Sequence, residues 1–292
     1  MNVLELESVW KRYGRTAALQ GVDLALEGGY LVGLVGPNGA GKTTLIKSIL
    51  NLVRIDSGMI RVFGMDHRHD EREVRRRVGF VHESSHLFDE LTARGHERIA
   101  RTCYPRWDHD RFTSYLSRFA LDPGAKVGTY SGGMRMKLAL AMALSHNAEL
   151  ILMDEPTSGL DPATRQDLMD AVAAELENDG RSFIVSTHIT SDLDLLADHL
   201  VVLLHGSVAL SANREDLADD WALCRGGPDV VDSTTHGLFL GLRRSEYGFT
   251  AITSSPETVR RTYGNRVLLE RISVGDLVVH LTREDQHENV AR

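Results

Sequence analysis

The sequence predicts an α/β fold with a mainly parallel sheet, followed by a smaller accessory domain at the carboxyl-terminal end. Short apolar runs are predicted as strands, and they are Leu31–Val35, Glu149–Asp154, Phe183–Thr187 and Leu200–Leu204. Continuous apolar character is typical of parallel strands that helices cover on both faces. Segments with helical periodicity fill the intervals between these strands, and this alternation indicates a parallel sheet.

The other elements follow from periodicity and capping. Leu4–Glu7 and Val22–Leu26 alternate like strands, and with Met59–Phe63 they predict an additional antiparallel piece. Helices are expected to begin near Gly41, after Trp107 and Asp108, after Ser131, and at Pro162, where the helix should run to Leu176. Proline is acceptable in the first turn of a helix, because the N–H that it lacks would have no partner there.

The alternation of predicted strands and helices ends after about residue 212, which predicts two domains. Residues 1–215 should form the main domain, with a helical subdomain at about 84–145, and residues 216–292 a small accessory domain. Gly226-Gly227-Pro228 is predicted as a linker. Val267–Leu269 and Leu277–Leu281 are predicted as short strands of the accessory domain.

Composition argues against several classes of protein. The 292 residues carry a formal net charge of −8, which argues against a general nucleic-acid binder, since such proteins have an excess of Lys and Arg. Only two cysteines occur, Cys103 and Cys224, so a disulfide framework is not expected. The same observation predicts a reducing cytosol as the compartment. Residues 1–5 lack the pattern of a secretory signal, and the longest apolar run, Leu200–Leu204, is far shorter than the ~20 residues that span a bilayer.

A phosphate-binding loop lies between the first apolar strand and the helix near Gly41. The pattern G-x-x-x-x-G-K-[ST] is satisfied by Gly36, Pro37, Asn38, Gly39, Ala40, Gly41, Lys42 and Thr43, and Thr44 follows. The glycines let successive backbone N–H groups face one point, and the helix presents its positive end to the phosphates. Lys42 is expected to reach the β- and γ-phosphates, and the Thr43 hydroxyl to bind Mg²⁺.

Two carboxylates end a buried strand. Leu150–Met153 is apolar, and Asp154 and Glu155 follow it. The carboxyl edge of a parallel sheet is where α/β proteins bind ligands. Asp154 is suited to the Mg²⁺ shell, and Glu155 to orienting or deprotonating the attacking water. The sequence therefore predicts a nucleoside triphosphatase.

Further motifs narrow this class. Tyr130-Ser131-Gly132-Gly133-Met134 closely resembles the signature motif of ABC ATPases, which is usually Leu-Ser-Gly-Gly-Gln. Ser158-Gly159-Leu160-Asp161 looks like the D-loop of that family, and Ser186-Thr187-His188 looks like its switch segment. Tyr13 sits where the family has an aromatic residue that stacks on adenine.

The resemblance implies a head-to-tail dimer of nucleotide-binding domains, either a homodimer or a pair with a homologous ATPase. Each ATP would lie between the loop of one domain and the signature motif of the other. Ser131, Gly132 and Gly133 would then contact the γ-phosphate of the partner's ATP, Asp161 would lie in the same seam, and His188 would help to position water and Glu155. A γ-phosphate held from both sides stabilises the closed dimer.

Two positions depart from the family pattern. Glu83 stands where the Q-loop has Gln, and it is either a ligand in the Mg²⁺ shell or only part of the loop that couples to the membrane subunit. Met134 replaces the signature Gln, which should remove a polar contact and leave the Ser-Gly-Gly donors in place.

A finer resemblance is to the YtrB-type branch of ABC-2 exporters. It is carried by Tyr104–Asp108, Ser131–Ala141 and Thr187–Leu193, and the resemblance as a whole covers about residues 3–215. It implies ABC-2-type transmembrane subunits as partners and a cytoplasmic location on the inner face of the cell membrane. Phe88 and Leu91 are candidates for contacting a coupling helix of those subunits, although packing inside the helical subdomain is as good an interpretation.

Two alternatives stay open beside the transport ATPase. One is a soluble ABC ATPase that acts on DNA, ribosomes or protein assembly; however, the chain has a single nucleotide-binding domain and no sustained heptads. The other is a regulatory nucleotide-binding module without turnover, which the presence of both Glu155 and His188 disfavours.

Overall fold

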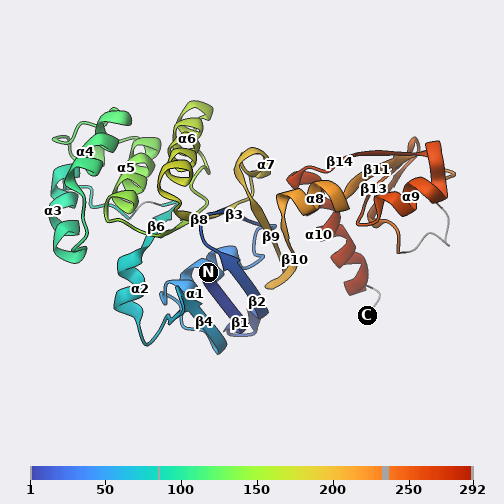
Figure 1. Cartoon of the computed structure of the whole chain (residues 1–292), viewed down its shortest axis with the longest axis horizontal. Coiled ribbons are helices and arrows are strands. Elements are labelled where there is room, and N and C mark those ends of the chain that lie inside the picture. Colours follow the sequence, from blue (N-terminus) through green and yellow to red (C-terminus); the bar gives the residue numbers. More distant parts are fainter. Residues whose placement is uncertain (1, 85, 232–236, 291–292) are drawn as a thin grey trace.

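The structure of the protein is a computed structural model, which describes residues 2–84, 86–231 and 237–290 (Figure 1). Three sheets are described. The first two, with the helices around them, form the main body, and the third lies in the part of the chain that extends to one side (Figure 1). Among the described residues, none of the helices combines the length and apolar character that crossing a bilayer requires.

The central sheet has six strands in the order β10-β9-β3-β8-β7-β6. Their bounds are β3 (Leu31–Val35), β6 (Val78–His82), β7 (Leu150–Asp154), β8 (Ser182–Thr187), β9 (His199–Leu204) and β10 (Ser207–Asn213). The first five of these pair in parallel, and β10 pairs with β9 in antiparallel orientation at one edge. The predicted parallel sheet is confirmed, and β3, β7 and β8 are buried along their whole length, as their apolar runs require.

An antiparallel sheet packs beside the central one. Its order is β2-β1-β4-β5, with β1 (Asn2–Tyr13), β2 (Thr16–Glu27), β4 (Ser57–Val62) and β5 (Met65–Asp66). The helix α1 (Lys42–Ile49) buries Leu45, Ile46 and Ile49 against both sheets. This shared core fixes α1, and with it the loop that precedes α1, at the carboxyl end of β3.

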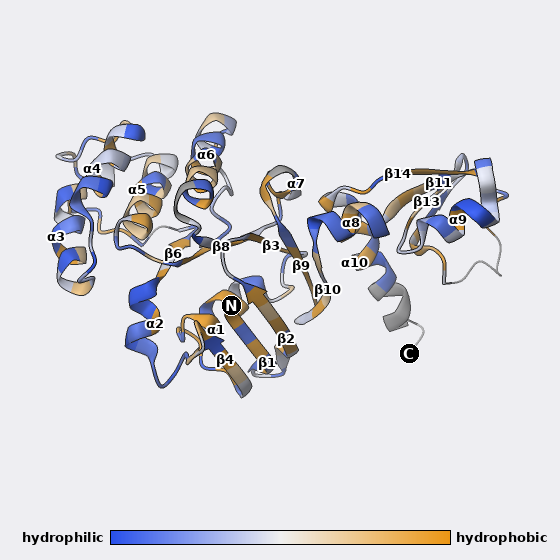
Figure 2. Cartoon of the chain, in the orientation of Figure 1, coloured by the Kyte–Doolittle hydropathy of each residue, from blue (hydrophilic) through white to orange (hydrophobic). Residues whose placement is uncertain are grey.

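A helical layer covers the other face of the central sheet. It contains α3 (Ala93–Cys103), α4 (His109–Arg118), η1 (Val127–Thr129), α5 (Gly132–Ser145) and α6 (Pro162–Asp179), and α2 (Glu71–Arg77) leads into β6. Thr92, Asp108, Ser131 and Asp161 cap α3, α4, α5 and α6 in turn, each accepting a hydrogen bond from a backbone N–H of the first turn. Figure 2 shows apolar residues on α5 and hydrophilic ones along α2 and α3.

A buried cluster of charges ties the helical layer together. Glu175 on α6 accepts hydrogen bonds from Nη2 of Arg111 on α4 at 2.6 and 2.8 Å, and also from the Tyr115 hydroxyl. Arg181, just before β8, places its Nε 3.1 Å from Glu175 and donates to the carbonyls of Leu144 and Ala148. Because a buried carboxylate needs such partners, this cluster specifies how α4, α6 and the sheet dock.

His146 makes the stability of the fold depend on pH. Its ring is buried and stacks on Tyr104 at 4.1 Å between centroids, and burial lowers the pKa of His146 to about 4. The unfolded chain binds a proton near pH 6.5, so protonation favours unfolding as the pH falls from 6.5 towards 4. The free energy of unfolding should fall by roughly 1–3 kcal/mol over that window.

Urea denaturation at pH 7 and pH 5 measures this loss. His146→Phe, which keeps an apolar ring against Tyr104, should make the free energy of unfolding less dependent on pH. His69→Phe, at an exposed position, should leave the pH dependence as it is in the parent protein. An unchanged pH dependence in His146→Phe would contradict the assignment.

The chain continues from β10 into a C-terminal unit, defined here as the described residues from 222 to 290. The short α8 (Arg214–Asp220) precedes it, and α7 (Leu193–Leu196) with η2 (Thr190–Asp192) lies between β8 and β9. The unit contains β11 (Ala222–Gly226), β12 (Leu240–Ser245), β13 (Gly248–Thr253), α9 (Pro256–Tyr263), η3 (Gly264–Arg266), β14 (Val267–Arg271) and α10 (Val274–Val290), with the sheet order β12-β13-β11-β14. The predicted boundary between residues 215 and 216 falls inside α8, and the division into two domains stays a prediction.

Two predictions for this unit are wrong. Leu277–Leu281 belongs to α10 and is not a strand, because its burial follows a helical period: Leu277 and His280 are buried, whereas Val279 is exposed. Gly226-Gly227-Pro228 does not link two domains, because Gly226 ends β11 inside the unit and pairs with both Phe249 and Val267.

Candidate functional site

The phosphate-binding loop lies between β3 and α1, and its shape depends on glycine. Gly41 has a φ of +107°, and a Cβ there would lie 2.5 Å from the carbonyl oxygen of Ala18. A Cβ on Gly36 would lie 2.2 Å from the carbonyl oxygen of Leu203. The buried Lys42 donates from Nζ to the carbonyls of Gly36 at 2.8 Å and Pro37 at 3.3 Å. Its ammonium therefore lies inside the curve of the loop.

Asp154 lies at the end of β7, next to the first turn of α1. Its Oδ1 accepts hydrogen bonds from the Ser186 hydroxyl at 2.6 Å and from the Thr43 hydroxyl at 3.1 Å. The carboxylate is buried, so these bonds replace the water that a charged group would otherwise hold. Mg²⁺ binds oxygen ligands and is held in phosphate sites by one or two protein groups, so the oxygens of Thr43 and Asp154 fit it.

Glu155 adopts an unusual backbone conformation. Its φ is +50°, in the left-handed region that residues with a Cβ seldom occupy. The backbone N–H of Glu155 donates to Ser186, to the carbonyl oxygen at 3.0 Å and to the hydroxyl oxygen at 3.2 Å. Such conformations cluster at functional sites, where the surrounding structure holds them. The turn aims the side chain back across the sheet edge.

The carboxylate of Glu155 joins two other predicted site residues. Its Oε1 lies 3.6 Å from Nζ of Lys42, and its Oε2 lies 2.7 Å from Nδ1 of His188. The backbone N–H of His188 also donates to Oε2 at 3.3 Å. Lys42, Asp154, Glu155 and His188 come from three separate segments of sequence, and the structure brings all four to one edge of the central sheet. A carboxylate placed here can accept a proton from a water molecule next to a γ-phosphate bound at Lys42.

The predicted Mg²⁺ ligand Glu83 has an exposed side chain. Its backbone N–H donates to the carbonyl oxygen of Asp154 at 2.9 Å, which holds this loop against the end of β7. The preceding residue, His82, places Nε2 3.8 Å from Oδ2 of Asp154. A role for Glu83 as a ligand stays a prediction.

The sequence analysis did not predict two residues that lie close to Asp154, namely His82 and Ser186. Both lie opposite Asp154 in the sheet, because the register pairs His82 with Asp154 on one side and Asp154 with Ser186 on the other. The sequence feature that could have pointed to them is their position, because each is a polar residue near the carboxyl end of a strand next to β7. Sequence does not state which strands are neighbours.

The signature residues and the D-loop lie on the helical layer. The Ser131 hydroxyl accepts from the N–H of Met134 at 3.2 Å, so Ser131, Gly132 and Gly133 form the exposed or half-exposed start of α5. Asp161 starts α6, and hydrogen bonds from Thr164 hold the pKa of Asp161 below its ordinary value. Gly133 lies beside Thr164, where a Cβ would approach to 2.7 Å.

Tyr13 lies at the turn between β1 and β2, paired with Thr16, and half of it is exposed. Nζ of Lys11 lies 5.3 Å from the centre of its ring. An exposed aromatic face of this kind can stack on a nucleotide base. The adenine contact predicted for Tyr13 stays a prediction.

Comparisons with known proteins decide the family. The profile described as ABC transporter matches residues 19–158. The linearmycin resistance ATP-binding protein LnrL of Bacillus subtilis is 30% identical over 241 residues, which cover 81% of this chain and 76% of LnrL. The chain belongs to the ABC transporter family. The daunorubicin resistance ATP-binding protein DrrA2 of Streptomyces coeruleorubidus is 39% identical over 205 residues, which cover 68% of this chain and 63% of that relative's length.

Solved ABC cassettes have the same fold as this chain. A solved ATP binding subunit of an ABC transporter superposes with a TM-score of 0.69 at 27% identity, covering 74% of this chain and 92% of that subunit. A dimeric cassette, MJ0796 in a post-hydrolysis state with ADP and Pi, gives a TM-score of 0.65 at 26% identity and covers 72% of this chain and 98% of that one. The prediction of an ABC-type ATPase fold is therefore confirmed, and the chain is an ATP-binding ABC ATPase.

Proposed function

We propose that the chain is the ATP-hydrolysing subunit of an ABC-2-type exporter. The observation that carries this is the carboxylate of Glu155 between Lys42 and His188, because a module that only binds nucleotide has no need of a base in this place. Relatives named for daunorubicin resistance, linearmycin resistance and Nod factor export support a role in export. The same role implies a cytoplasmic location, on the inner face of the cell membrane.

Within this proposal each site residue has a separate role in ATP binding or hydrolysis. The loop from Gly36 to Thr44 binds the phosphates, Tyr13 stacks on adenine, and Glu155 accepts the proton of the attacking water. His188 holds the Glu155 carboxylate in place through the 2.7 Å contact. Thr43 and Asp154 would hold Mg²⁺, with Glu83 as a further candidate, and the ion would neutralise charge on the phosphates.

The proposal includes a head-to-tail dimer of cassettes. Ser131, Gly132 and Gly133 form the N-terminus of α5, which can receive the partner's γ-phosphate because backbone N–H groups converge there. Asp161, at the start of α6, would lie in the same interface between the cassettes. The solved cassette MJ0796, which is dimeric, supports the formation of a dimer. A homodimer and a pair with a homologous ATPase are both compatible with it.

ATP turnover per chain should therefore rise with protein concentration. Ser131→Asp can still cap α5, but it places a negative charge against the incoming phosphate, so turnover should fall at least about tenfold. Ser117→Ala, at an exposed position on α4, should behave like the parent protein. A rate per chain that is indifferent to dilution and to Ser131→Asp would show that a monomer is sufficient.

A hollow beside the loop at Glu83 suits the membrane partner. It has a volume of about 340 Å³ and lies between the end of α1, β6, α3 and α5. Its walls include Leu52, Phe80, Leu87, Trp107 and Met142. Leu52 is 54% exposed, and the nearby chain adds Phe88, which is 62% exposed and stacks on His96 at 6.0 Å. An amphipathic helix of a transmembrane subunit would cover these apolar groups.

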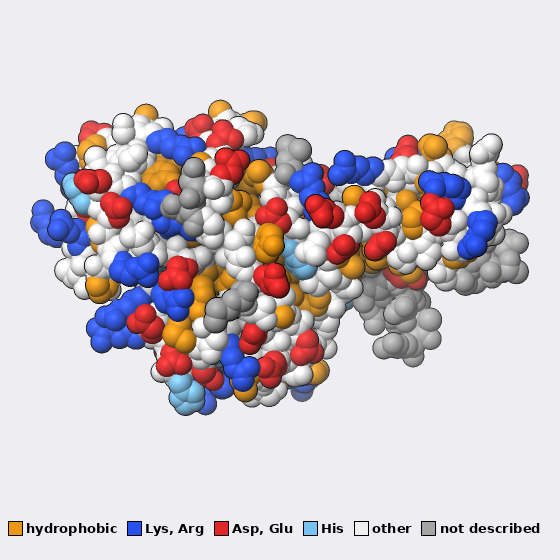
Figure 3. All heavy atoms as spheres, in the orientation of Figure 1, with side chains coloured by type: hydrophobic (Ala, Val, Ile, Leu, Met, Phe, Trp, Pro, Cys, Tyr) orange, Lys and Arg blue, Asp and Glu red, His pale blue; other side chains and the backbone are white. Residues whose placement is uncertain are grey.

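The distribution of basic side chains also supports binding of the membrane partner on this side of the chain. Figure 3 shows Lys and Arg side chains gathered over α2 and α3 on a chain whose net charge is −8. The arginines of these helices are Arg72, Arg75, Arg76, Arg77, Arg94, Arg98 and Arg101. Anionic lipids attract such a basic face, so it would lie towards the membrane when a transmembrane subunit occupies the hollow.

Purification from membranes tests the proposal. The tagged chain should bring down a polytopic membrane protein, and Leu52→Glu should abolish that association while leaving ATP turnover of the purified chain unchanged. Leu268→Glu is the matched control, because Leu268 is 58% exposed but lies on β14 in the C-terminal unit. Sedimentation with ribosomes or DNA, without a membrane partner, would favour the soluble alternative.

A further inference from the structure

A groove lies between α3 and α4, at the end of the main body opposite the C-terminal unit (Figure 1). Its volume is about 600 Å³. Its floor includes the buried core side chains of Phe112, Leu116 and Leu121. Pro123 lines the groove beside the start of α3, where its carbonyl oxygen accepts the backbone N–H of Arg94 at 3.3 Å. Because the lining belongs to two capped helices and to the core, the fold itself sets the shape of this α3–α4 groove.

Three arginines of α3 line the groove, namely Arg94, Arg98 and Arg101. Their spacing of four and then three residues places them on one face of the helix, along about 10 Å of its length. All three residues are exposed. Within the described part of the chain, none of their guanidinium groups forms an ion pair or a hydrogen bond. The three positive charges are therefore free to bind an anion.

The groove keeps a net positive charge. Glu97 is the single carboxylate among the described residues that line it, against three arginines, and Glu97 is buried. Its Oε1 accepts a hydrogen bond from Nε1 of Trp107 at 3.1 Å and lies 2.6 Å from Nδ1 of His109. The interactions of this carboxylate thus hold α3 against the start of α4.

The neighbouring basic helix, α2, differs in this respect. Three of its four arginines lie within ion-pair distance of a glutamate, and these pairs are Arg75–Glu71 at 2.7 Å, Arg76–Glu73 at 3.7 Å and Arg77–Glu149 at 2.6 Å. A paired guanidinium has part of its charge and of its donors already engaged. The positive charge that an anionic ligand can use is therefore concentrated in the α3–α4 groove.

We propose that the α3–α4 groove binds the phosphate of an anionic phospholipid headgroup between neighbouring arginines of α3. Residues at this helical spacing have Cβ atoms about 5–6 Å apart, so two guanidinium groups can reach one phosphate, and each can donate two parallel hydrogen bonds to its oxygens. Basic pockets that face the membrane bind lipid headgroups in this way.

The position of the groove favours a lipid over a soluble phosphate compound. The apolar hollow that we assign to the membrane subunit lies against another part of α3, which contributes Ala100 and Tyr104 to its walls. With a transmembrane subunit in that hollow, the α3–α4 groove would lie beside the subunit, where lipid headgroups surround it. The inference rests on the membrane location proposed above and adds a ligand to it.

Sedimentation of the purified full chain with vesicles tests the inference. Vesicles of phosphatidylglycerol and phosphatidylcholine in equal parts should bind the chain, and vesicles of phosphatidylcholine alone should bind it at least about tenfold more weakly. The measurement contains no membrane subunit, so it can fail while the chain still brings down its polytopic partner, and the reverse can also occur. Absence of binding to the anionic vesicles, or equally tight binding of free glycerol phosphate, would overturn the proposal.

Charge-conserving substitutions separate a bound headgroup from diffuse attraction. Arg94→Lys, Arg98→Lys and Arg101→Lys together keep the charge but remove the forked donors, so binding to the anionic vesicles should weaken about tenfold. The matched control makes the same change at three arginines of α2, namely Arg72, Arg75 and Arg76. This control should bind the vesicles like the parent protein. If the α3 variant also binds like the parent protein, net charge alone attracts the chain and no headgroup occupies the groove.

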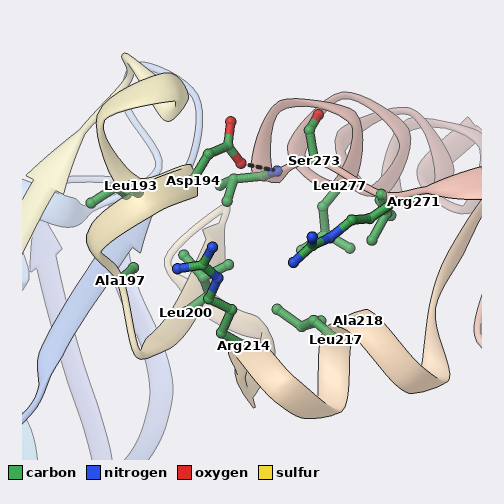
Figure 4. Close-up of a pocket in the computed structure, with 12 residues that line it drawn as sticks. Leu193, Asp194, Ala197, Leu200, Arg214, Leu217, Ala218, Arg271, Ser273 and Leu277 are labelled. Carbon is green, nitrogen blue, oxygen red and sulfur yellow. Dashed lines mark hydrogen bonds between the residues drawn. The ribbon is translucent and has the colours of Figure 1, made fainter.

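Two further changes locate the lipid. Thr113→Gln extends a neutral side chain into the groove from an exposed position of α4 and should weaken vesicle binding about tenfold, whereas Ser114→Gln, outside the lining, should not change it. Arg271→Gln should not change it either, because Arg271 lines a different hollow, together with Leu193 and Leu277 (Figure 4). ATP turnover at the parent rate shows that each variant is folded. Unchanged vesicle binding in a folded Thr113→Gln protein would place the lipid elsewhere and reject this site.

Discussion

Glu155→Gln should lower ATP turnover by about 10²- to 10⁴-fold while ATP binding persists, because the amide cannot accept the proton of the attacking water. Gln has nearly the same shape, and it meets the same backbone strain at φ +50° as Glu does, so the change isolates the charge. ATP should then hold the two cassettes together, since the γ-phosphate is no longer lost.

Single-turnover hydrolysis and size-exclusion chromatography in ATP measure these two effects. Glu177→Gln, an exposed carboxylate on α6, is the control and should turn over ATP like the parent protein. Full turnover in Glu155→Gln would remove Glu155 from the role of base. If no dimer accumulates in ATP, then loss of the γ-phosphate is not what separates the two cassettes.

Lys42→Ala should weaken ATP binding by at least about a hundredfold, because a buried ammonium that meets the phosphates makes charge-assisted hydrogen bonds. Lys42 also donates to the carbonyls of Gly36 and Pro37, so its loss loosens the loop as well. Both effects act on binding, whereas Glu155→Gln acts on the chemical step.

Equilibrium binding of a fluorescent ATP analogue measures the affinity. Lys47→Ala is the control, since Lys47 lies in the last turn of the same helix α1. Thermal unfolding without nucleotide shows whether Lys42→Ala keeps the fold. A folded Lys42→Ala protein with undiminished affinity would disprove the phosphate contact.

The elements that sequence predicted best are those whose pattern is local and whose burial is complete. Leu31–Val35 is β3 to the residue, and the strand expected at Glu149–Asp154 is β7 with one residue fewer. The capping residues Asp108 and Ser131 mark the starts of α4 and α5. In each case the chain nearby contains all the information, since an apolar run or a capped first turn does not depend on a distant neighbour.

The C-terminal unit is where the same reasoning failed. The apolar run at 277–281 satisfies a strand pattern and a helix pattern equally over so few residues. What decides for α10 is packing, because one side of the helix covers the sheet at β12 and the hollow at Leu277. The glycines at 226 and 227 suggested a linker, but Gly226 pairs with two strands that come later in the chain.

The sequence by itself was enough to predict the chemistry of the site, because the phosphate-binding loop, the Asp154–Glu155 pair and the signature at Ser131 are contiguous runs whose residue types indicate a function. Only the tertiary structure decided which side chains of the site come into contact. Parallel pairing of β6, β7 and β8 brings His82 and Ser186 to Asp154, and the left-handed turn at Glu155 aims its carboxylate at Lys42 and His188. The physical reason is that strand order and register are set by the burial of a whole sheet, and no short segment of sequence contains that information.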